Sequence, residues 1–164
     1  MRYLRLLLLL PLLTTLTILP GCDRGAHPAQ TGKVAPDFTV SDGSSSVRLA
    51  NYRGKTVLLN FWATWCGPCV AEMPSLLQFQ RENPDITVIA ISIDEDPVAY
   101  ANFIRNRHVN LITVRDPSQS AASLFHTDMW PETYAIDRNG VIRRKFVGAT
   151  DWSDPEIRNY LKRL

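Results

Sequence analysis

The chain has 164 residues and a mass of 18.5 kDa, which is enough for one globular domain with a hydrophobic core and too little for two ordinary ones. Hydrophobic residues make up 45% of the chain and charged residues 21%, a balance that excludes a disordered or collagen-like protein. The formal net charge is +2, and it comes from Arg2 and Arg5, because basic and acidic residues balance beyond residue 21. We therefore expect no nucleic-acid-binding surface.

The first 21 residues have the pattern of a secretory signal. Arg2 and Arg5 precede an apolar run over residues 6–19, and a short segment of small residues then ends at Cys22. As a helix the run would be about 21 Å long, shorter than the ~30 Å hydrocarbon core of a bilayer, which favours an export signal over a permanent span. The alternatives are an uncleaved anchor, or a signal cut elsewhere that leaves Cys22 as a free thiol.

The segment Leu-Pro-Gly-Cys that ends at Cys22 resembles a bacterial lipobox, in which a lipid is attached to the cysteine and cleavage makes that cysteine the first residue. Asp23 resembles the residue that keeps many lipoproteins of Gram-negative bacteria in the inner membrane. Residues 23–33 have no apolar side chain larger than alanine, which predicts a flexible tether. The predicted organisation is a signal peptide over 1–21, a lipidated cysteine with its tether over 22–33, and a folded domain over 34–164.

Two long apolar runs predict the centre of a sheet. Residues 56–62 and 86–93 are almost entirely apolar over the length of a strand, as expected of strands covered on both faces. Between them, residues 67–82 carry apolar side chains at helical spacing. Before them, two short alternating runs over 37–40 and 47–49 flank a turn-rich stretch and predict a small hairpin.

The second half continues the alternation. Asp96 before Pro97 predicts a helix that ends near Arg107, and Ser153 with Glu156 predicts a capping box for the last helix. The other segments are a strand over 111–114, a helix over 118–125, and strands over 132–137 and 141–147 around an Asn-Gly turn. The order β-β-β-α-β-α-β-α-β-β-α predicts an α/β domain with a mixed, mainly parallel sheet and helices on both faces.

Cys66 and Cys69 lie between the strand over 56–62 and the helix that follows it. A Cys-x-x-Cys pair could be half of a zinc site, but the chain has no second pair and its three histidines are scattered. A structural disulfide is another alternative, yet so short a loop restrains the unfolded chain little. Thiol-disulfide exchange is the better interpretation.

The position of Cys66 at the start of a helix predicts that it is the nucleophile. Free backbone N–H groups and the helix dipole favour an anion there, and so stabilise its thiolate. Cys66 would form a mixed disulfide with a substrate, and Cys69, one turn further and more buried, would resolve it. Pro68 stiffens the loop between them and supplies no N–H group.

The segment from Asn60 to Cys69, NFWATWCGPC, resembles the active site of thioredoxin-fold proteins. More narrowly, it resembles that of the membrane-anchored thiol-disulfide oxidoreductases of the bacterial envelope, the TlpA, ResA and DsbE group. The resemblance covers about 34–164 and implies a thioredoxin-like fold with an N-terminal hairpin and an inserted α-β unit. It also implies a redox-active cysteine pair with no other cofactor and no metal. The candidate substrate contacts beside this pair are Trp65, Gly67 and Pro68.

Two more residues match motifs of this group. Glu72 completes, with Pro74, the pattern C-x-x-C-x-x-E-x-P, which implies a proton carrier for the dithiol. Burial and a nearby thiolate would raise the pKa of Glu72 towards neutrality, whereas an exposed helix glutamate is the alternative. Pro131 matches the cis-proline that faces the dithiol, where the backbone of Trp130 would pair with an extended substrate. An ordinary trans turn is the alternative there. The Pro-Glu-Thr segment at Pro131 resembles the members that act in cytochrome c maturation.

The resemblance implies a lipid-anchored oxidoreductase at the periplasmic face of the inner membrane that reduces disulfides of exported proteins, including apocytochrome c. A membrane reductant must then supply electrons, because an oxidising compartment does not keep the pair reduced. One alternative is a thiol peroxidase, although Leu59 and Ala63 occupy the proline and threonine positions of the peroxidase pattern. Another is a non-catalytic module that holds unfolded proteins or copper through its two thiols.

Overall fold

The structure is a computed structural model that describes residues 30–164, so the predicted signal peptide and Cys22 lie outside the described residues. Its elements follow the predicted order, with one additional 3-10 turn. In chain order they are β1 (Thr39–Ser41), β2 (Ser46–Arg48), η1 (Leu49–Tyr52), β3 (Thr56–Trp62), α1 (Gly67–Glu82), β4 (Ile86–Ser92), α2 (Pro97–Asn106), β5 (Ile112–Arg115), α3 (Ser120–Leu124), β6 (Glu132–Ile136), β7 (Ile142–Val147) and α4 (Pro155–Leu161). No helix within residues 30–164 has the length and hydropathy needed to cross a membrane.

The central sheet has five strands in the order β5-β4-β3-β6-β7. The pairs β3–β4 and β4–β5 are parallel, whereas β3–β6 and β6–β7 are antiparallel. The prediction of a mixed sheet is confirmed, but the prediction that it is mainly parallel is wrong. A parallel pair needs a crossover helix, and β6 and β7 are joined instead by a short turn in which Gly140 has a φ of 76°.

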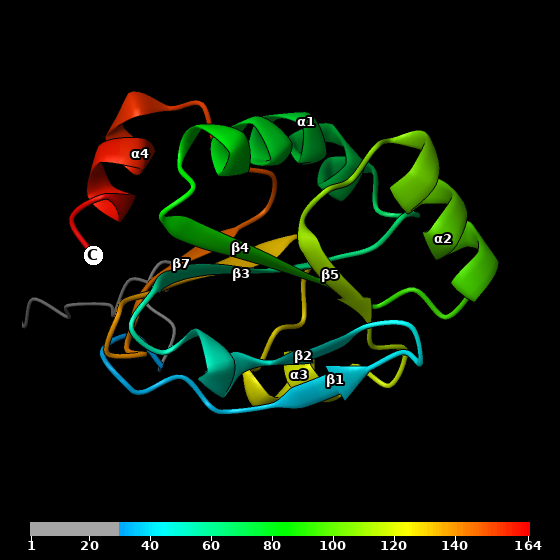
Figure 1. Cartoon of the computed structure of the whole chain (residues 1–164), viewed down its shortest axis with the longest axis horizontal. Helices are drawn as coiled ribbons and strands as arrows, with labels where there is room; N and C mark the ends of the chain where they lie inside the picture. Colours follow the sequence, from blue (N-terminus) through cyan, green and yellow to red (C-terminus); the bar gives the residue numbers. More distant parts are fainter. Residues whose placement is uncertain (1–29) are drawn as a thin grey trace, which may run out of the picture.

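Helices cover both faces of this sheet, as predicted. Figure 1 shows α1, α2 and α4 on one face, and α3 with the β1–β2 hairpin on the other. The side chains of β3 alternate between the two faces, as the pleat requires. Leu58 and Trp62 pack in the core under α1, whereas Leu59 and Phe61 pack in the core on the hairpin side. Asn60, two residues from each of the first pair, therefore faces α1.

The described chain begins with a segment bound to β7. The N–H of Gly32 donates to the carbonyl of Ile142 at 2.8 Å, and the N–H of Ile142 donates to Lys33 at 2.9 Å. Val34 forms an isolated bridge with Val141. The predicted domain start at residue 34 therefore falls inside an ordered segment. The flexible tether was predicted because residues 23–33 lack large apolar side chains. Residues 32–34 are ordered instead by backbone contacts with the open edge of the sheet.

The helix starts confirm one predicted cap and correct another. Asp96 Oδ1 accepts from the N–H groups of Val98 and Ala99 at the start of α2, as expected. At the start of α4 the cap is Asp154, which accepts from the N–H of Glu156 at 2.7 Å, so the capping box predicted for Ser153 is wrong. The reason is Pro155, which takes the first helical position and makes the residue before it the cap.

Candidate active site

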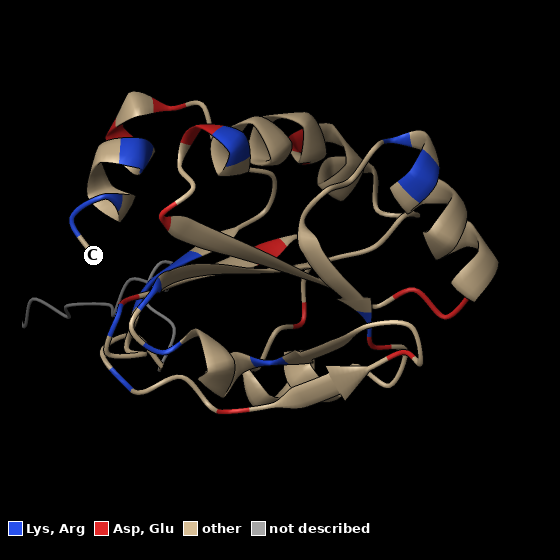
Figure 2. Cartoon of the chain, in the orientation of Figure 1, with Lys and Arg blue, Asp and Glu red and all other residues tan. Residues whose placement is uncertain are grey.

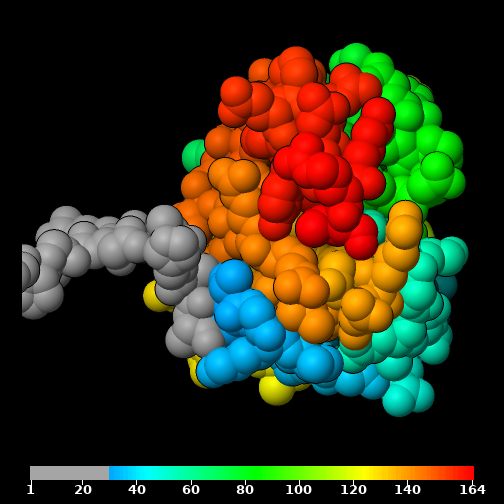
Figure 3. All heavy atoms as spheres, turned by 90° about the vertical axis from the view of Figure 1, so that its left-hand side faces the viewer, coloured from blue at the N-terminus to red at the C-terminus, as the bar shows by residue number. Residues whose placement is uncertain are grey.

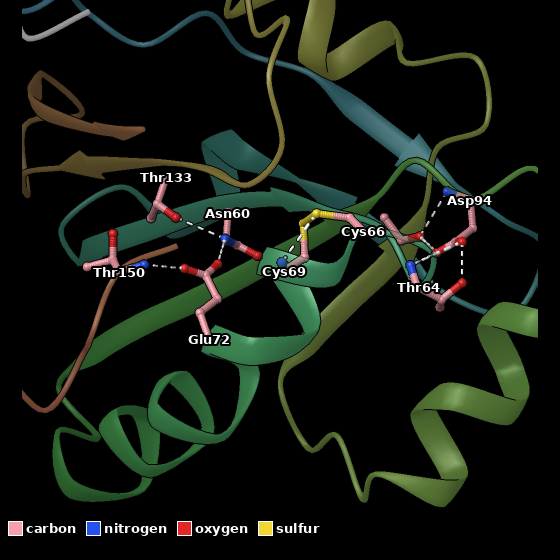
Figure 4. Close-up of a disulfide and its surroundings, with 9 residues drawn as sticks. Asn60, Thr64, Cys66, Cys69, Glu72, Asp94, Thr133 and Thr150 are labelled. Atoms are coloured by element: carbon pink, nitrogen blue, oxygen red, sulfur yellow. Dashed lines mark hydrogen bonds between the residues drawn. A yellow bond between two sulfur atoms is a disulfide. The ribbon is translucent and has the colours of Figure 1, made fainter. Parts of the chain in front are cut away.

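Cys66 and Cys69 form a disulfide at the N-terminus of α1 (Figure 4). Cys66 is the N-cap of the helix, and its Sγ accepts from the backbone N–H of Cys69 at 3.2 Å. Cys66 is 6% exposed and Cys69 is fully buried at 0%. The predicted difference in burial is confirmed, so Cys66 is the sulfur that a substrate can reach. An N–H group and a helix dipole directed at this sulfur stabilise it as a thiolate once the disulfide opens.

The turn before Cys66 is held by Asp94, a buried residue that the sequence analysis missed. Its carboxylate accepts from the backbone N–H of Thr64 at 3.0 Å, from Thr64 Oγ1 at 2.6 Å and from Ser92 Oγ at 2.6 Å. In the parallel pairing Ser92 lies opposite Trp62, so β3 and β4 end at the same sheet edge. The sequence does contain a signal for this contact, because Asp94 follows closely after the end of β4, the parallel neighbour of β3. Asp94 thus fixes the backbone two residues before the nucleophile.

Replacing Asp94 with alanine is expected to loosen this turn. Thr64 would lose the acceptor for its backbone N–H and hydroxyl, which should destabilise the fold by about 1–3 kcal/mol. Urea unfolding measures the loss, and amide hydrogen exchange at Thr64 and Cys66 localises it. The control is Glu95→Ala, because Glu95 is the exposed neighbour of Asp94. Unchanged exchange at Thr64 would contradict this role.

Glu72 is buried on α1, one helical turn beyond Cys69. It is 4% exposed, which excludes the alternative of an exposed helix glutamate. Its Oε1 accepts from Asn60 Nδ2 at 2.9 Å, and its Oε2 accepts from the N–H of Thr150 at 2.9 Å. Burial raises the pKa of Glu72 to about 7, against the opposing effect of these two hydrogen bonds. The indole N–H of Trp152 also lowers the pKa of Glu72 by favouring its charged form. This N–H makes no hydrogen bond of normal geometry with any described residue.

Asn60 links Glu72 to the strand that follows the cis-proline. Its Nδ2 donates both to Glu72 and to Thr133 Oγ1, the latter also at 2.9 Å. Asn60 and Thr133 are directly opposite each other in the β3–β6 pairing. Figure 4 shows this group on one side of the disulfide, with Thr64 and Asp94 on the other. A neutral amide at this point holds the Glu72 carboxyl group without adding a charge.

The Trp130–Pro131 peptide bond is cis, as predicted. Glu132 is opposite Phe61 in the β3–β6 pairing, so Pro131 lies at the end of β3 from which the chain turns towards Cys66. Trp130 is half-buried against the core that contains both cysteines. Trp65 and Met129 are 64% and 53% exposed. The predicted contacts Trp65, Gly67, Pro68 and Trp130 are all at least partly exposed, and Pro131 is buried.

A buried ion pair follows the cis-proline, and the sequence analysis did not identify it. Glu132 accepts from Lys145 Nζ at 2.7 Å, and both side chains are largely buried. The hydroxyl of Tyr134 also donates to Glu132, at 3.2 Å, and burial raises the pKa of that hydroxyl. Opposite charges on neighbouring antiparallel strands were the available signal. Removing one partner would leave a buried charge unpaired, so the pair fixes the start of β6.

Thiol-disulfide exchange needs one sulfur that a substrate can reach and a second within bonding distance, and the first turn of α1 supplies both. Residues 30–164 contain no cluster of His, Cys, Asp or Glu side chains placed to hold a metal ion. The cysteine pair is the reactive group, and the chain is a thiol-disulfide oxidoreductase with a thioredoxin-like fold. The sequence pattern described as Redoxin matches residues 30–163, and the chain belongs to that family.

Comparisons with known proteins agree with this class. The chain is similar to the thiol-disulfide oxidoreductase ResA of Bacillus thuringiensis strain Al Hakam, with 28% identity over 151 residues that cover 90% of this chain and 86% of the relative. ResA of Geobacillus kaustophilus is 30% identical over 128 residues, which cover 76% and 74% of the two chains.

Among solved structures, a DsbE-like thiol:disulfide interchange protein of Chlorobium tepidum has a TM-score of 0.70 at 28% identity, covering 81% of this chain and 93% of the other. A DsbF homologue from Corynebacterium diphtheriae has a TM-score of 0.72 at 22% identity, covering 89% and 97%, and shows the fold alone.

Proposed function

We propose that this oxidoreductase works as a dithiol reductant of exported proteins on the outer side of the cytoplasmic membrane, with the cysteines of apocytochrome c among its substrates. The observation that carries the proposal is the pairing of an accessible sulfur on Cys66 with a buried carboxyl group, Glu72, one turn beyond Cys69. The signal-like segment over 1–21 and Cys22 support the location and the lipid anchor. The resemblance of the Pro-Glu-Thr segment at Pro131 to cytochrome c maturation proteins supports the substrate.

In this mechanism the reduced enzyme starts with Cys66 as a thiolate. It attacks one sulfur of a substrate disulfide, and the other substrate sulfur leaves as a thiolate. The Cys69 thiol then gives its proton to the Glu72 carboxylate and attacks Cys66 Sγ, which releases the second substrate thiolate. The substrate gains two electrons, and the enzyme is left with the Cys66–Cys69 disulfide. A membrane dithiol reductant would return it to the reduced form.

The side chains around Cys66 support a protein substrate. Trp65, Gly67 and Pro68 are exposed beside it, and Trp130 and Pro131 come just before β6, at the end of β3 from which the chain turns towards Cys66. An extended peptide with a cystine could pair with this backbone while its apolar side chains contact Trp65. We therefore assign substrate binding to these residues.

The Cys69→Ser variant tests the proposal because it can form the mixed disulfide and cannot resolve it. Expressed as the full chain in the native envelope, it is expected to accumulate covalent adducts through Cys66 that can be identified by mass spectrometry. The matched control is the double variant Cys66→Ser, Cys69→Ser, which should trap nothing. Apocytochrome c among the adducts would support the proposal. Capture only of an oxidising disulfide donor would argue for oxidase activity, and peroxide consumption by the wild type would argue for a peroxidase.

A further inference from the structure

The first described residues lie at the end of the molecule opposite the disulfide. β3 and β4 both run towards the active site, so Thr56, at the start of β3, and the turn between β6 and β7 lie at the far end. Gly32 and Lys33 are hydrogen-bonded to Ile142, next to that turn. Figure 3 shows this end with residues 30–40, the β6–β7 turn region and α4 side by side. Residues 1–29 therefore join the domain far from Cys66.

Six exposed basic residues lie at or next to positions of this far end, and we call them the basic end: Lys33, Arg53, Lys55, Arg138, Lys162 and Arg163. Two contacts place members of the group together. The N–H of Gly54, between Arg53 and Lys55, donates to the carbonyl of Arg138 at 2.9 Å, and a surface hollow is lined by both Arg138 and Lys162. Within residues 30–164, none of the six forms a salt bridge with a carboxylate.

The acidic residues at this end offset little of that charge. Glu82 is paired with Arg158 at 2.6 Å and Asp137 with Arg143 at 2.7 Å, so each is already neutralised by another arginine. Asp85 lines the same hollow as Lys162 and remains as a carboxylate of this surface outside any described salt bridge. Asp154 and Glu156 line a second hollow with Arg144 and Arg163, where two carboxylates offset two arginines. The other five side chains of the basic end still outnumber Asp85 and leave a positive excess there.

The active-site end carries three exposed carboxylates and one half-buried cation, Arg115, which donates to the backbone carbonyls of Asp94 and Glu95. Glu95 and Asp96 follow β4 beside the active-site turn, and Asp128 precedes the cis-proline segment, all three exposed. Figure 2 shows blue segments at the left, where the described chain begins, and red segments where β4 leads into α2, while α2 itself also carries blue and α4 also carries red, so the separation of charge is partial. The chain is nearly neutral as a whole, so what matters is this separation along the strand direction. An extended negative surface would attract one end of the domain and repel the other.

We propose that the basic end rests on the anionic phospholipid headgroups of the membrane that holds the chain, so that Cys66 points away from the bilayer. The inference rests on the proposed function, in which a lipid on Cys22 attaches the domain to a membrane. If residues between Cys22 and Gln30 form the tether predicted from sequence, they span roughly 16 Å. Screening acts over about 10 Å at 0.1 M salt, which is shorter than this span, but a flexible tether also allows smaller separations and so lets the basic end approach the headgroup charge to within that distance.

Contact of the basic end with the membrane would keep Cys66 accessible to exported proteins. A domain that turned freely on its tether would spend part of its time with Cys66 against the lipid, where an exported protein cannot approach. Contact through the basic end keeps the exposed surface of Trp65 and Met129 towards the solvent side. The tether sets the distance from the membrane, and the charge separation sets the direction in which the active site faces.

The test uses the full chain, purified from bacterial membranes and incorporated into lipid nanodiscs that contain a headgroup spin-labelled lipid. Amide signals near the bilayer surface are broadened by the label. In discs with phosphatidylglycerol, we expect broadening at Lys33, Lys55 and Arg138, and little at Trp65 or Glu95. The pattern should fade at high salt and in discs of phosphatidylcholine alone.

The variant Lys55→Gln, Arg138→Gln should weaken this contact about fivefold for each charge removed. The matched control, Arg105→Gln, Arg107→Gln, removes the same charge from exposed positions on the last turn of α2 and just beyond it, and should leave the pattern unchanged. Insulin reduction should be normal in both variants.

Several results would overturn the proposal. Equal broadening at the two ends in anionic discs would mean that the domain has no preferred orientation. The same pattern in both kinds of disc, or the same weakening in the control variant, would exclude anionic lipid as the partner of the basic end. A chain that fails to stay in the discs would instead contradict the membrane attachment in the proposed function, so the two failures are distinguishable.

Discussion

Replacing Cys66 with serine is expected to lower the rate of insulin disulfide reduction by about a thousandfold or more. Cys66 is the cysteine of the pair that keeps some exposed surface, and Cys69 is fully buried, so we expect no second thiol to take over the attack. A serine hydroxyl at the helix N-terminus stays protonated and forms no disulfide. The measurement is the turbidity assay with insulin and dithiothreitol, together with loss of the reversible two-electron couple.

The control for this prediction is Cys22→Ser, because Cys22 precedes the described domain and should contribute nothing to exchange in solution. Cys69→Ser is the informative comparison, since it should also lose turnover and yet retain the ability to form a mixed disulfide. Equal loss of both turnover and adduct formation in the two single variants would contradict the assignment of Cys66 as the attacking sulfur.

The parts of the fold that were predicted best are those with strong local signals. β3 spans Thr56–Trp62 and α1 spans Gly67–Glu82, as expected. The continuous apolar run defines the extent of β3, and the cysteine before Gly-Pro marks the start of α1. The antiparallel half of the sheet was underestimated, since alternation of strands and helices indicates crossovers and the β6–β7 hairpin has none. The cap of α4 is Asp154, one residue beyond the predicted Ser153, because Pro155 takes the first helical position.

The residues of the candidate site also fall into two groups, those with a local signal in the sequence and those whose contacts depend on the topology. The disulfide and Glu72 lie within one stretch of sequence, so spacing alone placed them on one helix. Asp94 is 30 positions from Thr64, and the Glu132–Lys145 pair depends on the pairing of two strands. Such contacts arise from the topology, and no local pattern contains them. Asn60 begins the segment that resembles the thioredoxin-fold active site, but its two hydrogen bonds depend on the position of α1 and on the register of β3 with β6.

Replacing Glu72 with glutamine is expected to slow the release of substrate from the mixed disulfide by about a hundredfold. In the oxidised structure burial raises the pKa of Glu72 to about 7, and a thiolate at Cys69 would raise it further. Resolution needs the carboxylate as a base, so the wild-type rate should rise with pH through this range. The variant should lose this inflection and retain only the titration of the thiols. A single-turnover pH profile measures the difference.

The same substitution should change how stability depends on pH. The pKa of Glu72 is about 7 in the folded protein and 4.5 in the reference state, so the folded state keeps a proton that the unfolded chain releases between these values. The stabilisation from the protonated carboxyl group is therefore complete below about pH 4.5 and is lost as pH rises through 7, a change of about 3 kcal/mol. Relative to the wild type, Glu72→Gln should gain this amount across that window in urea unfolding of the oxidised protein.

Glu82→Gln is the matched control, because Glu82 ends the same helix at the surface. A hydrogen bond from Gln78 lowers the pKa of Glu82, so any pH dependence that it contributes has the opposite sign. Glu72 itself lines a surface hollow between α1 and residues 149–151, together with Ser75 and Thr150, and this hollow gives its proton a route to water. A Glu72→Gln variant with a wild-type pH profile would mean that the Cys69 proton leaves by another path, and the carboxyl group would then have only a structural role.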